Sequence, residues 1–102
     1  MSERSGIQAQ VLATLKQLGI YHMRLNSGRV KVKGGWMSLA PEGTADVVAF
    51  PDRKTPVWLE CKADTGQSEA QCEFECRVVN LGHSYHLIRT LDDLEPLLKE
   101  MR

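Results

Sequence analysis

The sequence lacks any apolar run that approaches the roughly 20 residues needed to cross a bilayer. Its N-terminus also lacks the uninterrupted apolar core of a signal peptide. No internal repeat, linker or low-complexity segment interrupts the chain. Its 102 residues, 42% apolar and 25% charged, have the composition of a globular domain with one hydrophobic core. We therefore expect a cytosolic protein that forms a single domain over residues 1–102 and does not contact membranes.

Cysteine is scarce, and its spacing does not match the common zinc modules. The residues concerned are Cys61, Cys72, Cys76, His83 and His86. None of them forms the close Cys-x-x-Cys pair of a zinc ribbon or finger. Three cysteines cannot all pair, and a cytosolic chain keeps its thiols reduced. We therefore expect no structural zinc, and a cysteine- or zinc-based interaction protein stays open as an alternative that elemental analysis would detect.

Acidic residues are absent from the stretch between Arg4 and Pro41. The same stretch carries six basic residues, which are Arg4, Lys16, Arg24, Arg29, Lys31 and Lys33. The net charge of the chain is zero, which by itself gives no reason to expect nucleic acid. Such an uneven distribution can nevertheless produce a basic face on a neutral protein. An incidental bias of composition is the alternative.

Apolar residues at three- and four-residue spacing predict three helices. The first begins at Ser2 or Ser5 and ends near Leu18. The second covers residues 68–81, where Ser68 and Gln71 match a capping box. The third begins at Thr90 or Asp92. The side chains expected to face inward from the second helix are Phe74, Val78 and Leu81.

Alternating patterns predict strands over residues 21–26, 29–33, 45–50, 57–62 and 84–89. The last of these follows a helical crossover and is expected to run parallel to residues 57–62. Tyr21, Met23 and Leu25 are expected to form one buried face.

Residues 29–33 alternate basic and apolar side chains, which is typical of a solvated edge strand and also of a strand that presents cations to phosphates. Residues 36–39 are expected to be a loop or a short strand. We expect Trp36 to lie in the core rather than to stack on a base.

Residues 45–50 and 57–62 are predicted to form the central hairpin. In an antiparallel pair centred on Arg53, opposed residues lie equally far from Arg53, so Asp46 faces Glu60. Lys62 shares their face because strand side chains repeat every two residues. Two carboxylates so close are unfavourable unless a cation lies between them, and hard divalent cations prefer oxygen ligands. The pattern therefore predicts a metal site on an interior hairpin covered by helices on both faces.

Asp46, a loop and then Glu60-Cys61-Lys62 resemble the PD-(D/E)xK nuclease superfamily. A wider set of motifs resembles its VRR-NUC domain: Asn26-Ser27-Gly28, Gly43-Thr44-Ala45-Asp46, Ser68-x-x-Gln71, and Gly82 followed by Tyr85. The resemblance extends from Glu3 to about Leu98. Many family members have an apolar residue in place of Cys61 and proline in place of Ala45, and neither change removes a functional group. The fold implied is α/β and restriction-endonuclease-like, a mixed central sheet flanked by helices in the order α-β-β-β-β-α-β-α.

The resemblance implies a metal-dependent phosphodiesterase with Mg²⁺ or Mn²⁺ as its cofactor. Its implied metal ligands are Asp46, Glu60 and the backbone carbonyl of Cys61, with Glu3 as a further ligand, direct or through water. The metal would polarise the scissile phosphate and lower the pKa of a bound water. Lys62 would orient that water or stabilise charge in the transition state. The products would carry a 5′-phosphate and a 3′-hydroxyl.

Gln71 matches a family glutamine that reaches back toward the active site, and a purely capping role is the alternative. The residues expected to contact DNA are Arg24, Asn26, Ser27, Arg29, Lys31 and Lys33.

Short stand-alone members of the family resemble archaeal Holliday-junction resolvases and tend to act as homodimers. A two-fold dimer suits a four-way junction, since symmetric cuts need two active sites related by an axis. The sequence is thus expected to encode a homodimeric, structure-selective DNA endonuclease for branched or junction DNA, in the cytoplasm of a bacterial or phage-infected cell. A flap, nicking or restriction-type nuclease and a non-catalytic DNA-binding module stay open as alternatives.

Overall fold

Four strands form a mixed sheet with the order β1-β4-β5-β6. They are β1 (Tyr21–Arg24), β4 (Val47–Phe50), β5 (Val57–Cys61) and β6 (Ser84–Ile88). Strands β1 and β5 both run antiparallel to β4, and β6 runs parallel to β5 as predicted. The computed structural model describes residues 3–27, 29–62 and 65–101, and side chains from residue 6 onward within these ranges.

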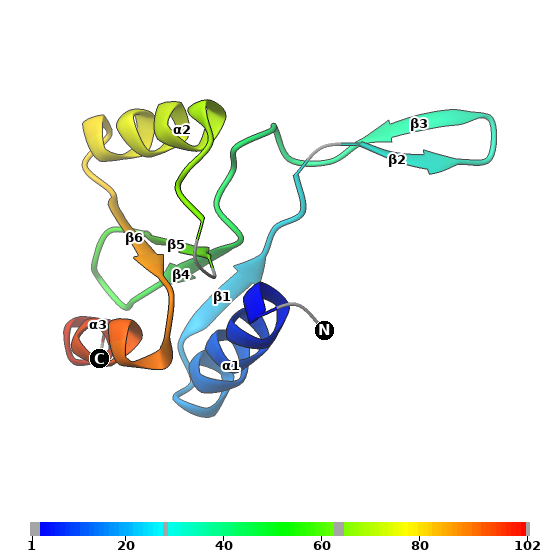
Figure 1. Cartoon of the computed structure of the whole chain (residues 1–102). Helices are drawn as coiled ribbons and strands as arrows, with labels where there is room; N and C mark the ends of the chain where they lie inside the picture. Colours follow the sequence, from blue (N-terminus) through cyan, green and yellow to red (C-terminus); the bar gives the residue numbers. More distant parts are fainter. Residues whose placement is uncertain (1–2, 28, 63–64, 102) are drawn as a thin grey trace.

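Three helices cover the two faces of this sheet (Figure 1). Helices α1 (Glu3–Gln17) and α3 (Leu91–Met101) lie on one face, and α2 (Glu69–Asn80) lies on the other. The α/β class, the mixed sheet and the three helices agree with the sequence-based expectation. Among the residues that the structure describes, no helix is long and apolar enough to cross a membrane.

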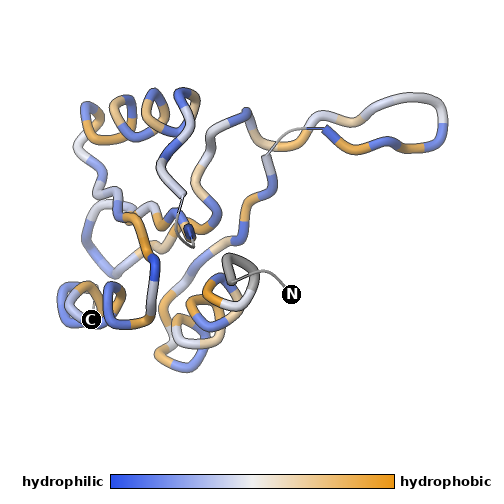
Figure 2. Tube along the Cα trace, in the orientation of Figure 1, coloured by the Kyte–Doolittle hydropathy of each residue, from blue (hydrophilic) through white to orange (hydrophobic). Residues whose placement is uncertain are grey.

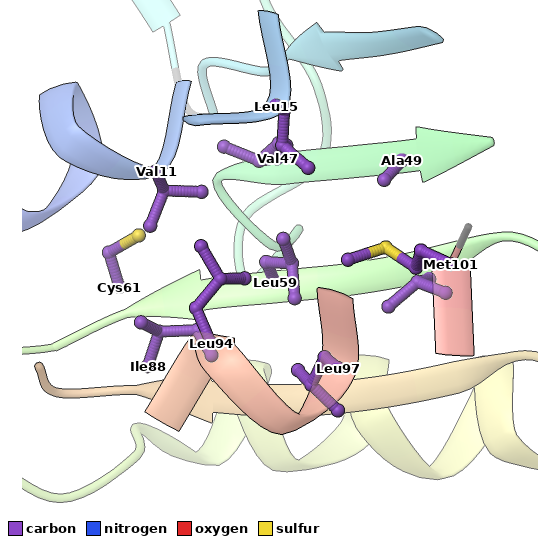
Figure 3. Close-up of a cluster of buried hydrophobic side chains, with 11 residues drawn as sticks. Val11, Leu15, Val47, Ala49, Leu59, Cys61, Ile88, Leu94, Leu97 and Met101 are labelled. Atoms are coloured by element: carbon purple, nitrogen blue, oxygen red, sulfur yellow. The ribbon is translucent and has the colours of Figure 1, made fainter. Parts of the chain in front are cut away.

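Two hydrophobic clusters hold these layers together. Figure 3 shows the larger one, which joins α1 and α3 to the sheet. Its labelled members are Val11, Leu15, Val47, Ala49, Leu59, Cys61, Ile88, Leu94, Leu97 and Met101. Each fully buried Val, Leu or Ile side chain contributes about 1.5–3 kcal/mol to stability relative to an exposed one. The smaller cluster lies under α2. There the Trp58 and Phe74 rings pack edge to face, with their centroids 5.0 Å apart.

The predicted register of the central hairpin is confirmed. Val47 pairs with Leu59 and Ala49 with Val57, which places Arg53 at the centre of the connection. Arg53 adopts a left-handed φ of 58° there. Because Val47, Ala49, Val57 and Leu59 point toward α1 and α3, residues on the alternate positions point toward α2.

A second, two-stranded sheet stands apart from the first (Figure 1). Strands β2 (Arg29–Val32) and β3 (Gly35–Ser38) pair antiparallel around a turn in which Gly34 has a φ of 92°. We call residues 29–38 the arm. The observed order therefore contains five strands before α2 rather than the four predicted, because residues 35–38 pair with β2.

Three predictions of burial were wrong. Tyr21 is 68% exposed and Met23 is also exposed, since both lie on the α2 face at β1, whereas α2 covers β5 and β6. Trp36 is 64% exposed because it lies on the arm. Leu81 is exposed because it follows the last turn of α2, where the chain turns at Gly82.

Candidate functional site

Asp46 and Glu60 are buried carboxylates on the central hairpin, with exposed fractions of 4% and 1%. Glu60 lies on β5, on the face that α2 covers, and Asp46 directly precedes β4, one residue beyond the last observed pair of the hairpin, Val47 with Leu59. On its other side Glu60 is paired with Leu87 of β6. Buried carboxylates need compensating interactions, so these two residues are the starting point for a candidate site.

Two backbone hydrogen bonds position Asp46. The amide of Cys61 donates to Asp46 Oδ2 at 2.8 Å, which ties the carboxylate across the hairpin to the residue after Glu60. The amide of Leu25 donates to the carbonyl oxygen of Asp46 at 2.7 Å. The backbone of β5 therefore helps to orient the Asp46 carboxylate.

The loop before Asp46 presses closely against α2. Gly43 adopts a φ of 89°, and a Cβ atom there would overlap the backbone carbonyl of Ala70. Thr44 donates both its amide and its hydroxyl to the carbonyl oxygen of Pro41, at 3.1 and 2.6 Å. Glycine at position 43 thus permits the close approach that holds Asp46 beneath α2.

A hydrogen-bonded group of three side chains adjoins the carboxylate pair. The Gln67 amide nitrogen donates to Tyr85 Oη at 3.1 Å and to Glu75 Oε1 at 3.0 Å. The pKa of Tyr85 is raised to about 12, mainly by burial, with smaller contributions from the carboxylates of Glu60, Glu75 and Asp46 and against the lowering effect of the Gln67 hydrogen bond. Tyr85 therefore stays a neutral hydroxyl at neutral pH.

The sequence reasoning did not assign roles to Gln67, Glu75 or Tyr85. Two features could have indicated that Glu75 and Tyr85 lie near the site. Glu75 follows Gln71 by one helical turn on α2. Tyr85 pairs with Trp58 in the parallel register and so shares its face with Glu60.

Lys62 and Cys61 follow Glu60 directly. Lys62 is half-buried, and its amide donates to the carbonyl of Ile88 at 3.1 Å, which extends the pairing with β6 beyond Cys61. Alternation places the Lys62 side chain on the Glu60 face. The Cys61 side chain points the other way, into the large cluster, so only its backbone groups are near the site.

Gln71 forms the predicted capping box. Its Oε1 accepts from the Ser68 amide at 2.8 Å, and its own amide donates to Ser68 Oγ at 3.2 Å. The observed contacts of Gln71 therefore support the capping role. The side chain of Glu3, the expected fourth ligand, lies outside the described residues.

The predicted DNA-binding residues are exposed, and they lie along the arm and the chain that leads into it. They are Arg24, Asn26, Ser27, Arg29, Lys31 and Lys33. The root of the arm is closed by a 2.8 Å hydrogen bond from the Ala40 amide to the Asn26 carbonyl. Because the preceding residue, Leu25, donates to the backbone carbonyl of Asp46, the root lies beside Asp46 while the arm extends away from it.

The donor set fits a hard divalent cation. Within the described ranges, no three or more His, Cys, Asp or Glu side chains are grouped as a metal site. Mg²⁺ is commonly held by one or two carboxylates and keeps several waters. Two carboxylates with a nearby backbone carbonyl therefore suit Mg²⁺ or Mn²⁺, whereas zinc sites need more nitrogen or sulfur ligands.

Comparisons of the chain with protein-family models, with curated proteins and with solved structures found no match.

Proposed function

We propose that this protein is a metal-dependent DNA endonuclease with a restriction-endonuclease-like, VRR-NUC-type fold. The observation that carries the proposal is the presence of two buried carboxylates on the central hairpin, Asp46 and Glu60, with Asp46 hydrogen-bonded to the residue after Glu60 and Lys62 next in sequence. The crossover through α2 to a parallel strand on the other side of β5 is compatible with that fold.

Asp46, Glu60 and the carbonyl of Cys61 are the groups that would hold Mg²⁺ or Mn²⁺. When bound, such a cation polarises the scissile phosphate and lowers the pKa of a coordinated water. The Cys61 amide keeps the Asp46 carboxylate in one orientation, which limits the reorganisation needed for binding.

Lys62 and Tyr85 affect the charge of the proposed active site. The ammonium of Lys62 stabilises negative charge on the phosphoryl oxygens or orients the attacking water. The water loses a proton to solvent as its oxygen bonds to phosphorus and the bond to the 3′-oxygen breaks, and the 3′-oxygen takes up a proton from solvent. The products carry a 5′-phosphate and a 3′-hydroxyl. Tyr85, which remains neutral, adds no third negative charge beside the two carboxylates.

The proposed substrate class is branched DNA, and the proposed active form is a homodimer. Two sites related by a two-fold axis would cut the two strands of a four-way junction symmetrically. The basic arm, which projects from the body of the protein, supplies a surface for the phosphate backbone.

The decisive experiment is cleavage of labelled four-way, flap and linear duplex DNA in Mg²⁺, Mn²⁺ or EDTA. We expect metal-dependent cutting of branched DNA that falls at least about 100-fold in Asp46→Asn and in Lys62→Ala, the usual loss when one charge-stabilising group is removed. Asp52→Asn, the same change at an exposed residue of the hairpin turn, should cut like the wild type.

A thermal melt of the same proteins separates loss of metal from loss of fold. Mn²⁺ should raise the melting temperature of the wild type and of Asp52→Asn but not of Asp46→Asn, since a ligand stabilises only a state that binds it. A wild type that binds DNA yet cuts nothing in either metal would refute the nuclease and favour a binding module.

A further inference from the structure

The arm is exposed along its whole length. Every residue from 29 to 38 is exposed, and the two strands project from the body of the protein (Figure 1). A two-stranded ribbon is at best marginally stable by itself, and among the described residues none of the arm belongs to either hydrophobic cluster. The chemistry of its side chains is therefore informative about what the arm contacts.

The register sorts these side chains onto two different faces. Arg29 pairs with Ser38 and Lys31 pairs with Trp36, so the basic residues and the indole share one face. Val30 pairs with Met37 and Val32 with Gly35, so the opposite face is apolar. Figure 2 shows the resulting alternation along β2. We call the side with Arg29, Lys31, Trp36 and Ser38 the basic face.

Trp36 is exposed and also held in place on this face. The guanidinium carbon of Arg29 lies 5.8 Å from the centroid of the Trp36 ring, a cation–π contact that restrains both side chains. The indole nevertheless remains 64% exposed. An aromatic ring that is already restrained loses less conformational freedom when it meets a planar ligand.

The charge of the arm selects a phosphate-bearing ligand. Arg29, Lys31 and Lys33 are its charged residues, and the arm contains no Asp or Glu. Cations on a ribbon attract a nucleic-acid backbone, and aromatic rings stack on bases without regard to sequence. In a continuous duplex the base faces are already stacked on each other, so an indole finds a free base face only where the bases are unpaired.

The arm is also connected to the carboxylate pair. Its root is closed at Asn26 and Ala40, and the neighbouring Leu25 amide donates to the Asp46 carbonyl at 2.7 Å. At about 3.3 Å per residue, the tip lies about 20 Å along the ribbon from this root. That length corresponds to about six nucleotides at 3.4 Å per nucleotide. One DNA molecule can therefore reach both places.

We propose that the basic face binds DNA at a single-stranded stretch, with Trp36 stacked on an unpaired base and Arg29 and Lys31 on the flanking phosphates. This inference deepens the proposed function by naming flaps and other partly single-stranded branches as preferred substrates. It depends on that function for the identity of the ligand, but binding at the arm requires no cleavage.

The test measures binding of the full chain in EDTA, where no cutting occurs. The ligands are a labelled thymidine oligonucleotide, a flap and a fully paired duplex of equal length. Trp36→Ala should weaken binding of the oligonucleotide and the flap about tenfold, as loss of one base–aromatic stack does, and weaken duplex binding less than about twofold. Trp36→Phe should restore most of the affinity. Met37→Ala, on the apolar face and 49% exposed, is the matched control and should bind normally.

Two further readouts identify the contacts. Thymidine oligonucleotide should quench the tryptophan fluorescence of the wild type, and the quenching should disappear in Trp36→Phe, which retains Trp58. Lys31→Gln should reduce the salt dependence of binding for all three ligands, because one fewer phosphate is neutralised.

Equal weakening of duplex and single-strand binding by Trp36→Ala would overturn the stacking inference. An equal loss in Met37→Ala with a change in sedimentation would overturn it in favour of self-association through the apolar face. The experiments can refute the proposed nuclease and the proposed binding at the arm independently of each other. Trp36-dependent binding without cleavage would leave the arm assigned and refute the nuclease, whereas normal cleavage of flaps by Trp36→Ala would refute the arm alone.

Discussion

Tyr85 combines burial with proximity to three carboxylates. Its hydroxyl accepts a hydrogen bond from Gln67, which is also bonded to Glu75. Burial and the charges of Glu60, Glu75 and Asp46 disfavour the phenolate, which raises the pKa of Tyr85 to about 12. Tyr85 thus supplies a neutral polar group next to two buried acids, and it remains neutral well above neutral pH.

This pKa shift predicts a loss of stability at alkaline pH. An unfolded tyrosine loses its proton near pH 10, whereas Tyr85 in the folded protein keeps it until about pH 12. The contribution to stability is therefore complete below pH 10 and is lost as the pH rises to 12, by at most about 3 kcal/mol. Urea denaturation in EDTA, from pH 8 upward, should show a shallower decline for Tyr85→Phe than for the wild type.

The variant also loses the acceptor for Gln67, so we expect it to be about 1 kcal/mol less stable at neutral pH. That offset is common to all pH values and does not affect the slope. Parallel curves for the two proteins above pH 10 would contradict the assignment of the shift to Tyr85.

Helix α2 and the loop before Asp46 illustrate how elements position the site. The capping box of Ser68 and Gln71 sets where α2 begins. Gly43 then sets how closely the loop approaches that helix, because a side chain at this position would overlap Ala70. The position of Asp46 relative to α2 therefore depends on Gly43, which lies three positions away and has no functional side chain.

Gly43→Ala should lower the free energy of unfolding by about 3 kcal/mol, from backbone strain together with the overlap at Ala70. Gly82→Ala provides a matched control, since Gly82 also has a φ of 89° but nothing within 4 Å of a Cβ atom. It should cost only the conformational penalty of about 1 kcal/mol. Urea denaturation at neutral pH measures both. Equal losses would mean that the Ala70 contact relaxes without cost.

At the scale of the molecule, the sheet separates two sets of packing interactions. The cluster with α1 and α3 supplies most of the buried aliphatic side chains. The cluster under α2 is smaller and lies next to the polar residues of the candidate site. The arm belongs to neither cluster, which leaves its side chains available to a ligand. The proposed DNA-binding surface thus lies apart from the hydrophobic clusters, whereas the candidate metal ligands lie on the central hairpin between them.

The homodimer is the prediction that belongs to this scale. Sedimentation equilibrium at micromolar concentration should give about twice the 11.5 kDa mass of the chain. Symmetric cleavage of a four-way junction requires two sites related by an axis. Sedimentation as a monomer, with or without Mg²⁺, would contradict the symmetric-junction version and leave cleavage of flaps by a single site.

Local patterns were sufficient to predict most elements and the hairpin at the candidate site. The capping box depends on residues three positions apart, and the register of the hairpin depends on a short connection centred on Arg53. Asp46 and Glu60 were therefore predicted to face each other, because strand alternation and a short turn are properties of neighbouring residues. Their proposed role as metal ligands remains a prediction.

The sequence alone determined the helices, the central hairpin and the register of its two strands, since these follow from local spacing. Only the tertiary structure decided that Tyr21 and Trp36 are exposed and that Gln67, Glu75 and Tyr85 meet beside the site. Exposure depends on which part of a sheet a helix covers, and α2 covers β5 and β6 but not β1. Contacts between distant side chains depend on the same packing, which no periodicity in the sequence encodes.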